Sequence, residues 1–132
     1  MDETYAYFAI VGSGSYSAIT SRLGISPSGA WSEGDPKPGG GVYPATKWRL
    51  ESGLDRSQGF EKHLEVLLPK LEARADAVKH LMPEYEAFIQ CVGYFEEPNS
   101  GFHLDAPIVA RIAALGIAVD FDLYSRASGK NG

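Results

Sequence analysis

The chain has 132 residues, of which 44% are hydrophobic and 22% charged, with a formal net charge of -5 at pH 7. This length and composition are typical of one soluble globular domain that buries its own core. The acidic balance argues against a nucleic-acid-binding protein, which normally carries a basic stripe, and disfavours an anionic membrane as partner. A single cysteine excludes an internal disulfide and a thiolate cluster for zinc or iron. The acidic start MDETYAYFAIVG lacks the basic region of a signal peptide, so we expect a cytoplasmic protein.

The first half of the chain alternates strands with less regular segments. Residues 4–11 are predicted to form a strand, with Ala6, Phe8 and Ile10 on one face and Tyr5, Tyr7, Ala9 and Val11 on the other. A short helix is expected over 17–23, with Gly24 as its stop. Residues 24–44 are rich in glycine and proline and are expected to form a long loop. The alternation resumes in a second predicted strand, 46–51.

The clearest pattern in the chain is a helical one. Residues 60–82 keep apolar side chains at spacings of three and four, which predicts one buried stripe, with a kink or break at Pro69. A third strand is expected over 86–95, followed by a turn at 97–101 and a short extended piece at 102–104.

The last part of the sequence predicts one helix, one strand and a flexible tail. Asp105 is a predicted N-cap for a helix over 106–115, and Gly116 is its stop. A last strand is expected over 117–124, and the tail 125–132 is expected to be flexible.

These elements predict one α/β domain, of the α+β kind, over residues 1–124. We expect a two-layer sandwich, in which one mixed sheet of four to five strands carries helices on one face.

The stretch FAIVGSGSYSAI, residues 8–19, resembles a strand and turn that cradle phosphate. A dinucleotide site needs the pattern G-x-G-x-x-G, however, and Ser17 occupies the third position after Gly12 and Gly14. We therefore expect a turn in which Ser15 or Ser17 caps a short helix, with weak phosphate binding at the helix start as the alternative.

Strand alternation separates a core face from an open one. If helices cover Phe8, Trp48, Ile89 and Phe121, the other face displays tyrosines together with charges of both signs. Such a face is either a binding surface or an ordinary solvent-facing side of a sheet. The residues expected on it are Tyr5, Tyr7, Lys47, Arg49, Gln90, Tyr94, Asp120, Asp122 and Tyr124.

Asp120 and Asp122 lie two residues apart on the last predicted strand, with Ile117, Val119, Phe121 and Leu123 expected to face the core. The aspartates either pair with Lys47 and Arg49, or they share a metal or divide into an acid and a base.

The other candidate residues favour structural roles. Cys91 is expected to be a buried, inert thiol. The spacing of His63, His80 and His103 does not predict a zinc site. Trp31, in the long loop, either anchors that loop to the body or awaits a partner, and we favour the anchor.

Four segments carry a resemblance to a known family. They are AITSRLGISPS, KWRLESG, FEKHLEVLLPKLEARADAVKHL and IVARIAALGIAVDFDLY. In order and spacing they resemble the bacterial family of uncharacterised proteins called domain of unknown function 4279, over roughly residues 5–124. The most specific parts are Trp48 to Ser52 and the passage with Asp120, Asp122 and Tyr124. The resemblance implies a small cytoplasmic α/β domain and supplies no catalytic residues.

The sequence leads us to expect a non-catalytic protein-binding module that acts as immunity or antitoxin proteins do, by masking a basic site on another protein. No catalytic residue, metal or cofactor is assigned. Trp31 is expected at the rim of the binding surface, whose residues are predicted to be Tyr5, Tyr7, Arg49, Tyr94, Asp120, Asp122 and Tyr124.

Two alternatives stay open. One is a small-molecule- or metal-dependent enzyme that uses Asp120, Asp122 and His103. The other is a homodimer that pairs through the last strand or the open face.

Overall fold

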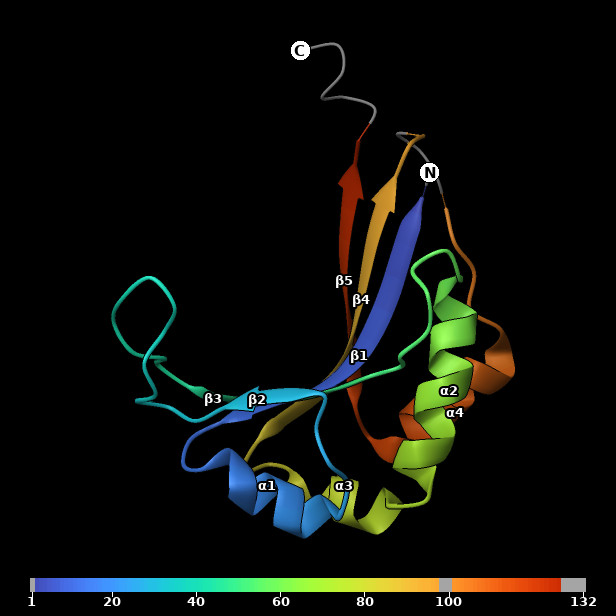
Figure 1. The fold of residues 1–132 in the computed structure, drawn as a ribbon. Helices are drawn as coiled ribbons and strands as arrows, with labels where there is room; N and C mark the ends of the chain where they lie inside the picture. Colours follow the sequence, from blue (N-terminus) through green and yellow to red (C-terminus); the bar gives the residue numbers. More distant parts are fainter. Residues whose placement is uncertain (1, 98–100, 127–132) are drawn as a thin grey trace.

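In a computed structural model that describes residues 2–97 and 101–126, the chain forms five strands and four helices (Figure 1). The strands are β1 (Glu3–Gly12), β2 (Gly29–Trp31), β3 (Thr46–Glu51), β4 (Glu86–Phe95) and β5 (Ala118–Ser125). The helices are α1 (Tyr16–Leu23), α2 (Phe60–Glu72), α3 (Ala75–Leu81) and α4 (Ala106–Leu115).

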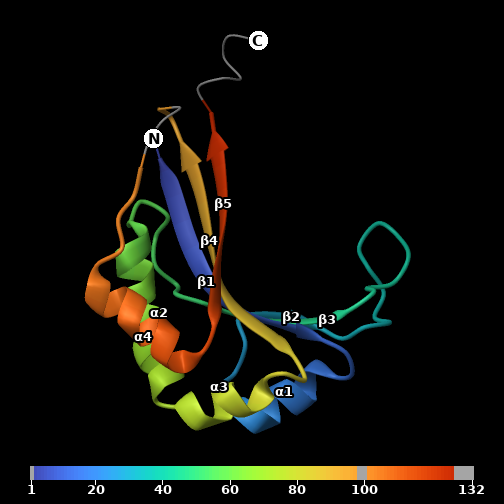
Figure 2. The same ribbon diagram turned by 180° about the vertical axis from the view of Figure 1, so that it is seen from behind.

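The strands build one open mixed sheet in the order β2-β3-β1-β4-β5. β1 lies in the middle and is antiparallel to both β3 and β4, whereas β5 runs parallel to β4 at one edge. The sheet bends sharply along its strands: α2 and α4 lie against one half and α1 and α3 beneath the other, all on the outside of the bend (Figures 1 and 2). The predicted α+β sandwich is confirmed.

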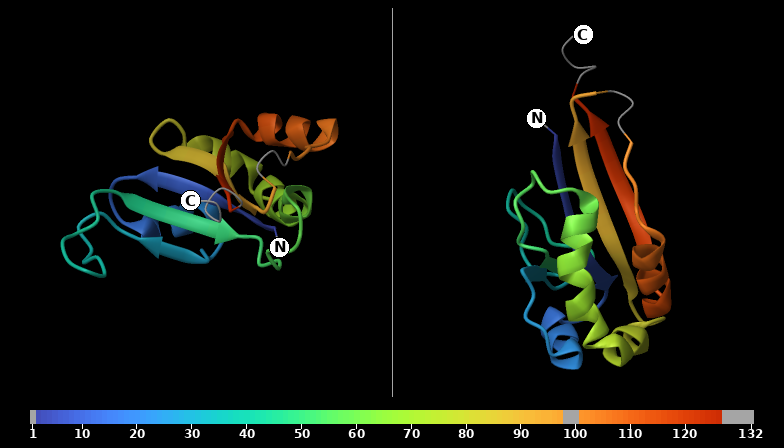
Figure 3. Two further views of the ribbon diagram at one scale, coloured as in Figure 1. Left: turned by 90° about the horizontal axis from the view of Figure 1, so that it is seen from above. Right: turned by 90° about the vertical axis from the view of Figure 1, so that its right-hand side faces the viewer.

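The core lies between the sheet and the helices. Phe8, Trp48 and Ile89 point into it and are fully buried, as their alternation predicts. They meet the apolar stripe of α2, in which Leu64 and Leu67 are also fully buried. Seen from the helix side, α2 stands in front of the sheet (Figure 3).

The predicted helix 60–82 divides in two, but not at Pro69. Pro69 lies inside α2 on its exposed side. Because proline has no N–H, the carbonyl of Glu65, four residues earlier, loses its helical hydrogen bond, and on this side of the helix water can replace it. The division comes at Arg74, whose Nε donates to the carbonyl of Leu23 at 2.6 Å. Arg74 thereby joins this break to the end of α1.

The segment predicted as a long loop is largely ordered. It contains β2, which pairs with β3, and a projecting hairpin, residues 32–45, closed by a bridge between Pro36 and Val42. The Trp31 ring stacks on Tyr43 at 4.3 Å, and Trp31 Nε1 donates to the carbonyl of Ala45 at 3.1 Å. Trp31 thus anchors the hairpin to the sheet.

The last strand differs from expectation in its burial. Ile117 is buried. Phe121 lies on the helix side of the sheet, as predicted, and its ring centre is 6.3 Å from that of Phe60. Phe121 and Leu123 are nevertheless 39% and 46% exposed, so they are not buried in the core. The reason is that β5 is an edge strand whose far end the helices do not cover (Figure 2). Residues 102–104, predicted to be extended, form no strand.

The folded part of the chain extends slightly beyond the predicted end of the domain at residue 124. Ser125, placed in the tail by the sequence, ends β5, and Arg126 pairs with Glu3. The rest of the predicted tail, 127–132, and most of the predicted turn, 98–100, lie outside the described residues. Among the described residues, no helix has the length and apolar character needed to cross a membrane.

Candidate functional site

The face of the sheet on the inside of the bend, which we call the open face, is covered by none of the four helices described above (Figures 1 and 2). The strand register aligns Tyr7 with Gln90, and Gln90 with Asp120. The same register aligns Tyr94 with Tyr124. All seven residues of the predicted binding surface lie on this face: Tyr5, Tyr7, Arg49, Tyr94, Asp120, Asp122 and Tyr124.

The centre of the open face is apolar. Tyr7 and Val92 are buried and Ala9 is 0% exposed, although no helix covers them. They form a small cluster of their own with Tyr5, Phe88 and Tyr94, which are partly buried. We call these six residues the apolar strip. The bend accounts for their burial, because it turns neighbouring side chains of the same face toward each other.

Cationic side chains lie over the tyrosines on the β3 side of the strip. The guanidinium of Arg49 lies 3.9 Å from the centre of the Tyr7 ring, and that of Arg56 lies 4.1 Å from the Tyr5 ring. Lys47 Nζ is 5.3 Å from the Tyr7 ring, and burial, with the nearby Arg49, lowers the pKa of its amine. Burial raises the pKa of the Tyr7 hydroxyl, so this ring stays neutral at pH 7.

Carboxylates lie on the opposite, β5 side. Asp120 and Asp122 are both exposed, and Asp122 Oδ2 accepts a hydrogen bond from Gln90 Nε2 at 3.2 Å. The expected pairing with Lys47 and Arg49 is wrong, because β1 and β4 separate β3 from β5. In the described part of the chain, neither aspartate has a cationic partner.

The residues of the alternative enzyme site do not converge. His103 Nε2 pairs with Asp105 Oδ1 at 2.8 Å, beside Glu61 of α2. The preceding ring, Phe102, packs against Phe121 at 4.9 Å, on the helix side of β5. Asp120 and Asp122 occupy the other side, so the sheet separates them from His103.

Glu61, His103 and Asp105 bring three ligand atoms within 4.8 Å of one another. The cluster is already linked internally, since Glu61 Oε2 accepts the backbone N–H of Asp105 at 2.5 Å. The His103 and Asp105 side chains are 79% and 62% exposed. These contacts are those of solvent-exposed, hydrogen-bonded side chains at the start of α4.

The glycine-rich turn before α1 holds an internal carboxylate where a phosphate loop would hold its ligand. The backbone N–H of Gly14 donates to Glu33 Oε1 at 2.7 Å, and that of Tyr16 donates to Ser32 Oγ at 2.9 Å. Ser15 caps the helix through the N–H of Ser17, as expected. Hydrogen-bond donors available to an anion are therefore already used by side chains of the chain itself.

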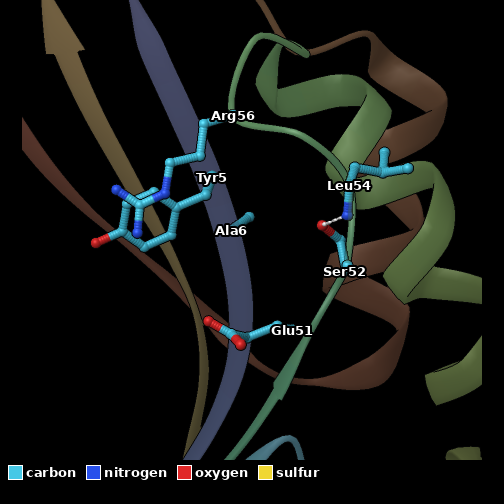
Figure 4. Close-up of a pocket in the computed structure, with 7 residues that line it drawn as sticks. Tyr5, Ala6, Glu51, Ser52, Leu54 and Arg56 are labelled. Atoms are coloured by element: carbon cyan, nitrogen blue, oxygen red, sulfur yellow. Dashed lines mark hydrogen bonds between the residues drawn. The ribbon is translucent and has the colours of Figure 1, made fainter.

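A pocket of about 140 Å³ opens at the rim of the open face, between β1 and the segment after β3 (Figure 4). Its lining residues are Tyr5, Ala6, Glu51, Ser52, Gly53, Leu54 and Arg56. Typical cofactor sites start at about 300 Å³, so this pocket fits a side chain rather than a cofactor. Arg56 comes from a loop with no periodic pattern, which is why the sequence did not indicate it.

At the wall of this pocket Ser52 contacts His63, which does not line it, with Oγ 2.5 Å from Nδ1. Ser52 Oγ also accepts the N–H of Leu54 at 3.2 Å, so the serine hydroxyl links the segment after β3 to His63. His63 is 0% exposed and Ser52 only 9%, so this pair is not presented to a substrate. It connects the end of β3 to α2.

Burial lowers the pKa of His63, whose buried Nε2 has no hydrogen-bond partner among the described residues. The unfolded chain therefore binds the proton more readily, and the free energy of unfolding falls as the pH drops below about 6.5. For one such group the slope is at most about 1.4 kcal/mol per pH unit. Urea unfolding at pH 7 and pH 5 is expected to show a smaller pH effect in His63→Gln than in the wild type.

The exposed His80 is the matched control, since His80→Gln is expected to keep the pH dependence of the wild type. An unchanged pH dependence in His63→Gln would contradict the assignment of this effect to His63.

Cys91 is fully buried on the core face of β4, and burial raises its pKa to about 12. A thiol with so high a pKa carries almost no thiolate at neutral pH, so it is unreactive. The predicted burial of Cys91 is confirmed.

Comparison with known proteins identifies a family and no individual relative. Neither the curated proteins nor the solved structures contain a significant match to the chain. The family model described as Domain of unknown function (DUF4279) matches residues 2–126. This match covers every strand and helix of the fold, and the chain therefore belongs to the DUF4279 family.

Proposed function

We propose that this chain is a protein-binding module that uses the open face. The observation that carries the proposal is the apolar strip, which gathers Tyr5, Tyr7, Phe88, Val92 and Tyr94 with Ala9 on a face without a helix. Aromatic side chains dominate the energetics of protein interfaces because they bury a large area at a low cost in conformational entropy.

The aromatic residues of this face are held in place before any partner binds. Tyr5 and Tyr7 stack at 6.4 Å, and Tyr94 and Tyr124 stack at 5.0 Å. The Tyr94 ring also lies 5.1 Å from the guanidinium of Arg126. Binding loses less free energy when contact side chains are already ordered, so this arrangement favours association.

The charges of the open face suggest a partner of mixed charge. Lys47, Arg49 and Arg56 lie on the β3 side, and Asp120 and Asp122 on the β5 side. An immunity-like protein that masks a uniformly basic site would favour an acidic surface throughout. We therefore propose a protein partner with both acidic and basic groups.

The test is capture of a partner by chemical crosslinking in a lysate of the native host. Wild type is compared with Tyr94→Ser/Tyr124→Ser, which removes the exposed end of the aromatic surface. We expect the wild type to capture a specific protein and the variant to lose it at least about tenfold, because aromatic anchors carry most of an interface's affinity.

Lys62→Ser/Glu65→Ser is the matched control. It changes a solvent-exposed pair on α2, far from the open face, and is expected to capture the partner as the wild type does. Equal capture by all three proteins would assign binding to another surface and contradict the proposal.

A further inference from the structure

We infer that the partner of the open face is a second copy of this chain, whose hairpin 32–45 seats against the tyrosines and aspartates of that face. This inference rests on the proposed function, because it names the occupant of the same surface. It is carried by the shape of the hairpin, the chemistry of its tip and the position of the hairpin relative to the bend.

The hairpin is a formed, projecting element. It extends beyond the end of β2 and β3, away from β5 (Figures 1 and 3). Backbone hydrogen bonds between its two arms hold it. The N–H of Gly34 donates to the carbonyl of Tyr43 at 2.9 Å, and the N–H of Tyr43 donates to the carbonyl of Asp35 at 3.0 Å. An ordered hairpin can dock without a large loss of conformational entropy.

The tip of the hairpin complements the far end of the open face. It exposes two prolines around Lys37, and Val42 is 58% exposed. Prolines dock well on surfaces lined by aromatic rings, which Tyr94 and Tyr124 provide. Lys37 carries a positive charge, and among the described residues Asp120 and Asp122 have no cationic partner.

The two complementary regions lie at opposite ends of one bent face. The hairpin continues the β2–β3 end of the sheet (Figure 2). Tyr94 and Tyr124 are paired next to the last residues of β4 and β5, at the other end of the face. The hairpin of one chain therefore projects away from Tyr94 and Tyr124 of the same chain and does not reach them. When two copies face each other across a two-fold axis that exchanges these ends, each hairpin meets the tyrosine end of the other copy.

Such a dimer makes the same contact twice. The second contact forms within a complex already joined by the first, which strengthens the association without new chemistry. The bend also favours this arrangement, because the inside of a bent sheet receives a projecting element better than a flat one.

Charge reversal at the two complementary sites gives the test. Lys37→Glu places an acid beside Asp120 and Asp122 of the other copy, and Asp120→Lys/Asp122→Lys places lysines beside Lys37. Sedimentation equilibrium is expected to show a wild-type dimer and, for each variant alone, a dimer dissociation constant raised at least about tenfold. An equimolar mixture of the two variants restores opposite charges at both contacts and is expected to form the mixed dimer, detected by native mass spectrometry.

The control is Lys62→Glu on α2, which is expected to dimerise as the wild type does. The substituted side chains are all exposed, and far-ultraviolet circular dichroism verifies the fold of each variant. A monomeric wild type, variants that dimerise normally, or a mixture that stays monomeric would each overturn the inference. A monomer that still captures another protein through Tyr94 and Tyr124 would leave the proposed function intact, so the two failures are distinguishable.

Discussion

Replacing Trp48 by alanine is expected to lower the free energy of unfolding by about 3–5 kcal/mol. The Trp48 side chain is 0% exposed and packs edge-on against Phe8 at 6.2 Å. Its Nε1 donates to Thr20 Oγ1 at 3.0 Å, so the substitution leaves both a cavity and a hydroxyl without its partner. Domains of this kind have a total stability of about 5–15 kcal/mol, so urea unfolding should show a large shift in midpoint.

Trp31, the other tryptophan of the chain, is the matched control. It is only partly buried and holds the hairpin rather than the core. Trp31→Ala is expected to cost distinctly less than Trp48→Ala. A larger loss for Trp31→Ala would contradict the place given to Trp48 at the centre of the fold.

Gly12→Ala is expected to destabilise the chain by about 1–3 kcal/mol, as overpacking of a core does. A Cβ atom at Gly12 would lie 2.4 Å from Cδ1 of Tyr85, inside any normal contact distance. Tyr85 is only 6% exposed and its ring faces the guanidinium of Arg22, so it has little room to retreat. Thermal and urea unfolding measure the loss.

The control substitution is Gly101→Ala, at an exposed glycine with no heavy atom within 4 Å of the added Cβ and a φ outside the left-handed region. We expect it to leave stability nearly unchanged. An equally small effect of Gly12→Ala would contradict the claim that the Tyr85 ring leaves no room for a side chain at position 12.

Much of the fold could be predicted because its signals are local. Strand β4 has the bounds that its apolar alternation predicts, and helix α4 ends at Gly116, whose positive φ of 73° suits a glycine. Strand β2 could not be predicted, because three residues, the first of them a glycine, are too few to show a period. The break after α2 depends on a contact between Arg74 and Leu23, residues distant in sequence.

In the candidate surface, too, features with a local sequence signal could be predicted and features that depend on distant contacts could not. A period of two places Tyr7, Asp120 and Tyr124 on one face once the register is known, and the sequence supplied that period. The burial of Ala9 and the bond from Gly14 to Glu33 depend on the bend and on the hairpin, so no local pattern indicates them. The binding role of the surface remains a prediction.

The position of β1 in the sheet has a consequence for the order in which the chain folds during synthesis. β1 is made first, yet it pairs with β3, complete only at Glu51, and with β4, complete only at Phe95. Contacts so distant in sequence form slowly, because a long loop must close before they are gained. The apolar residues of β1 thus leave the ribosome well before their partners, and the middle of the sheet is completed only when most of the chain has been translated.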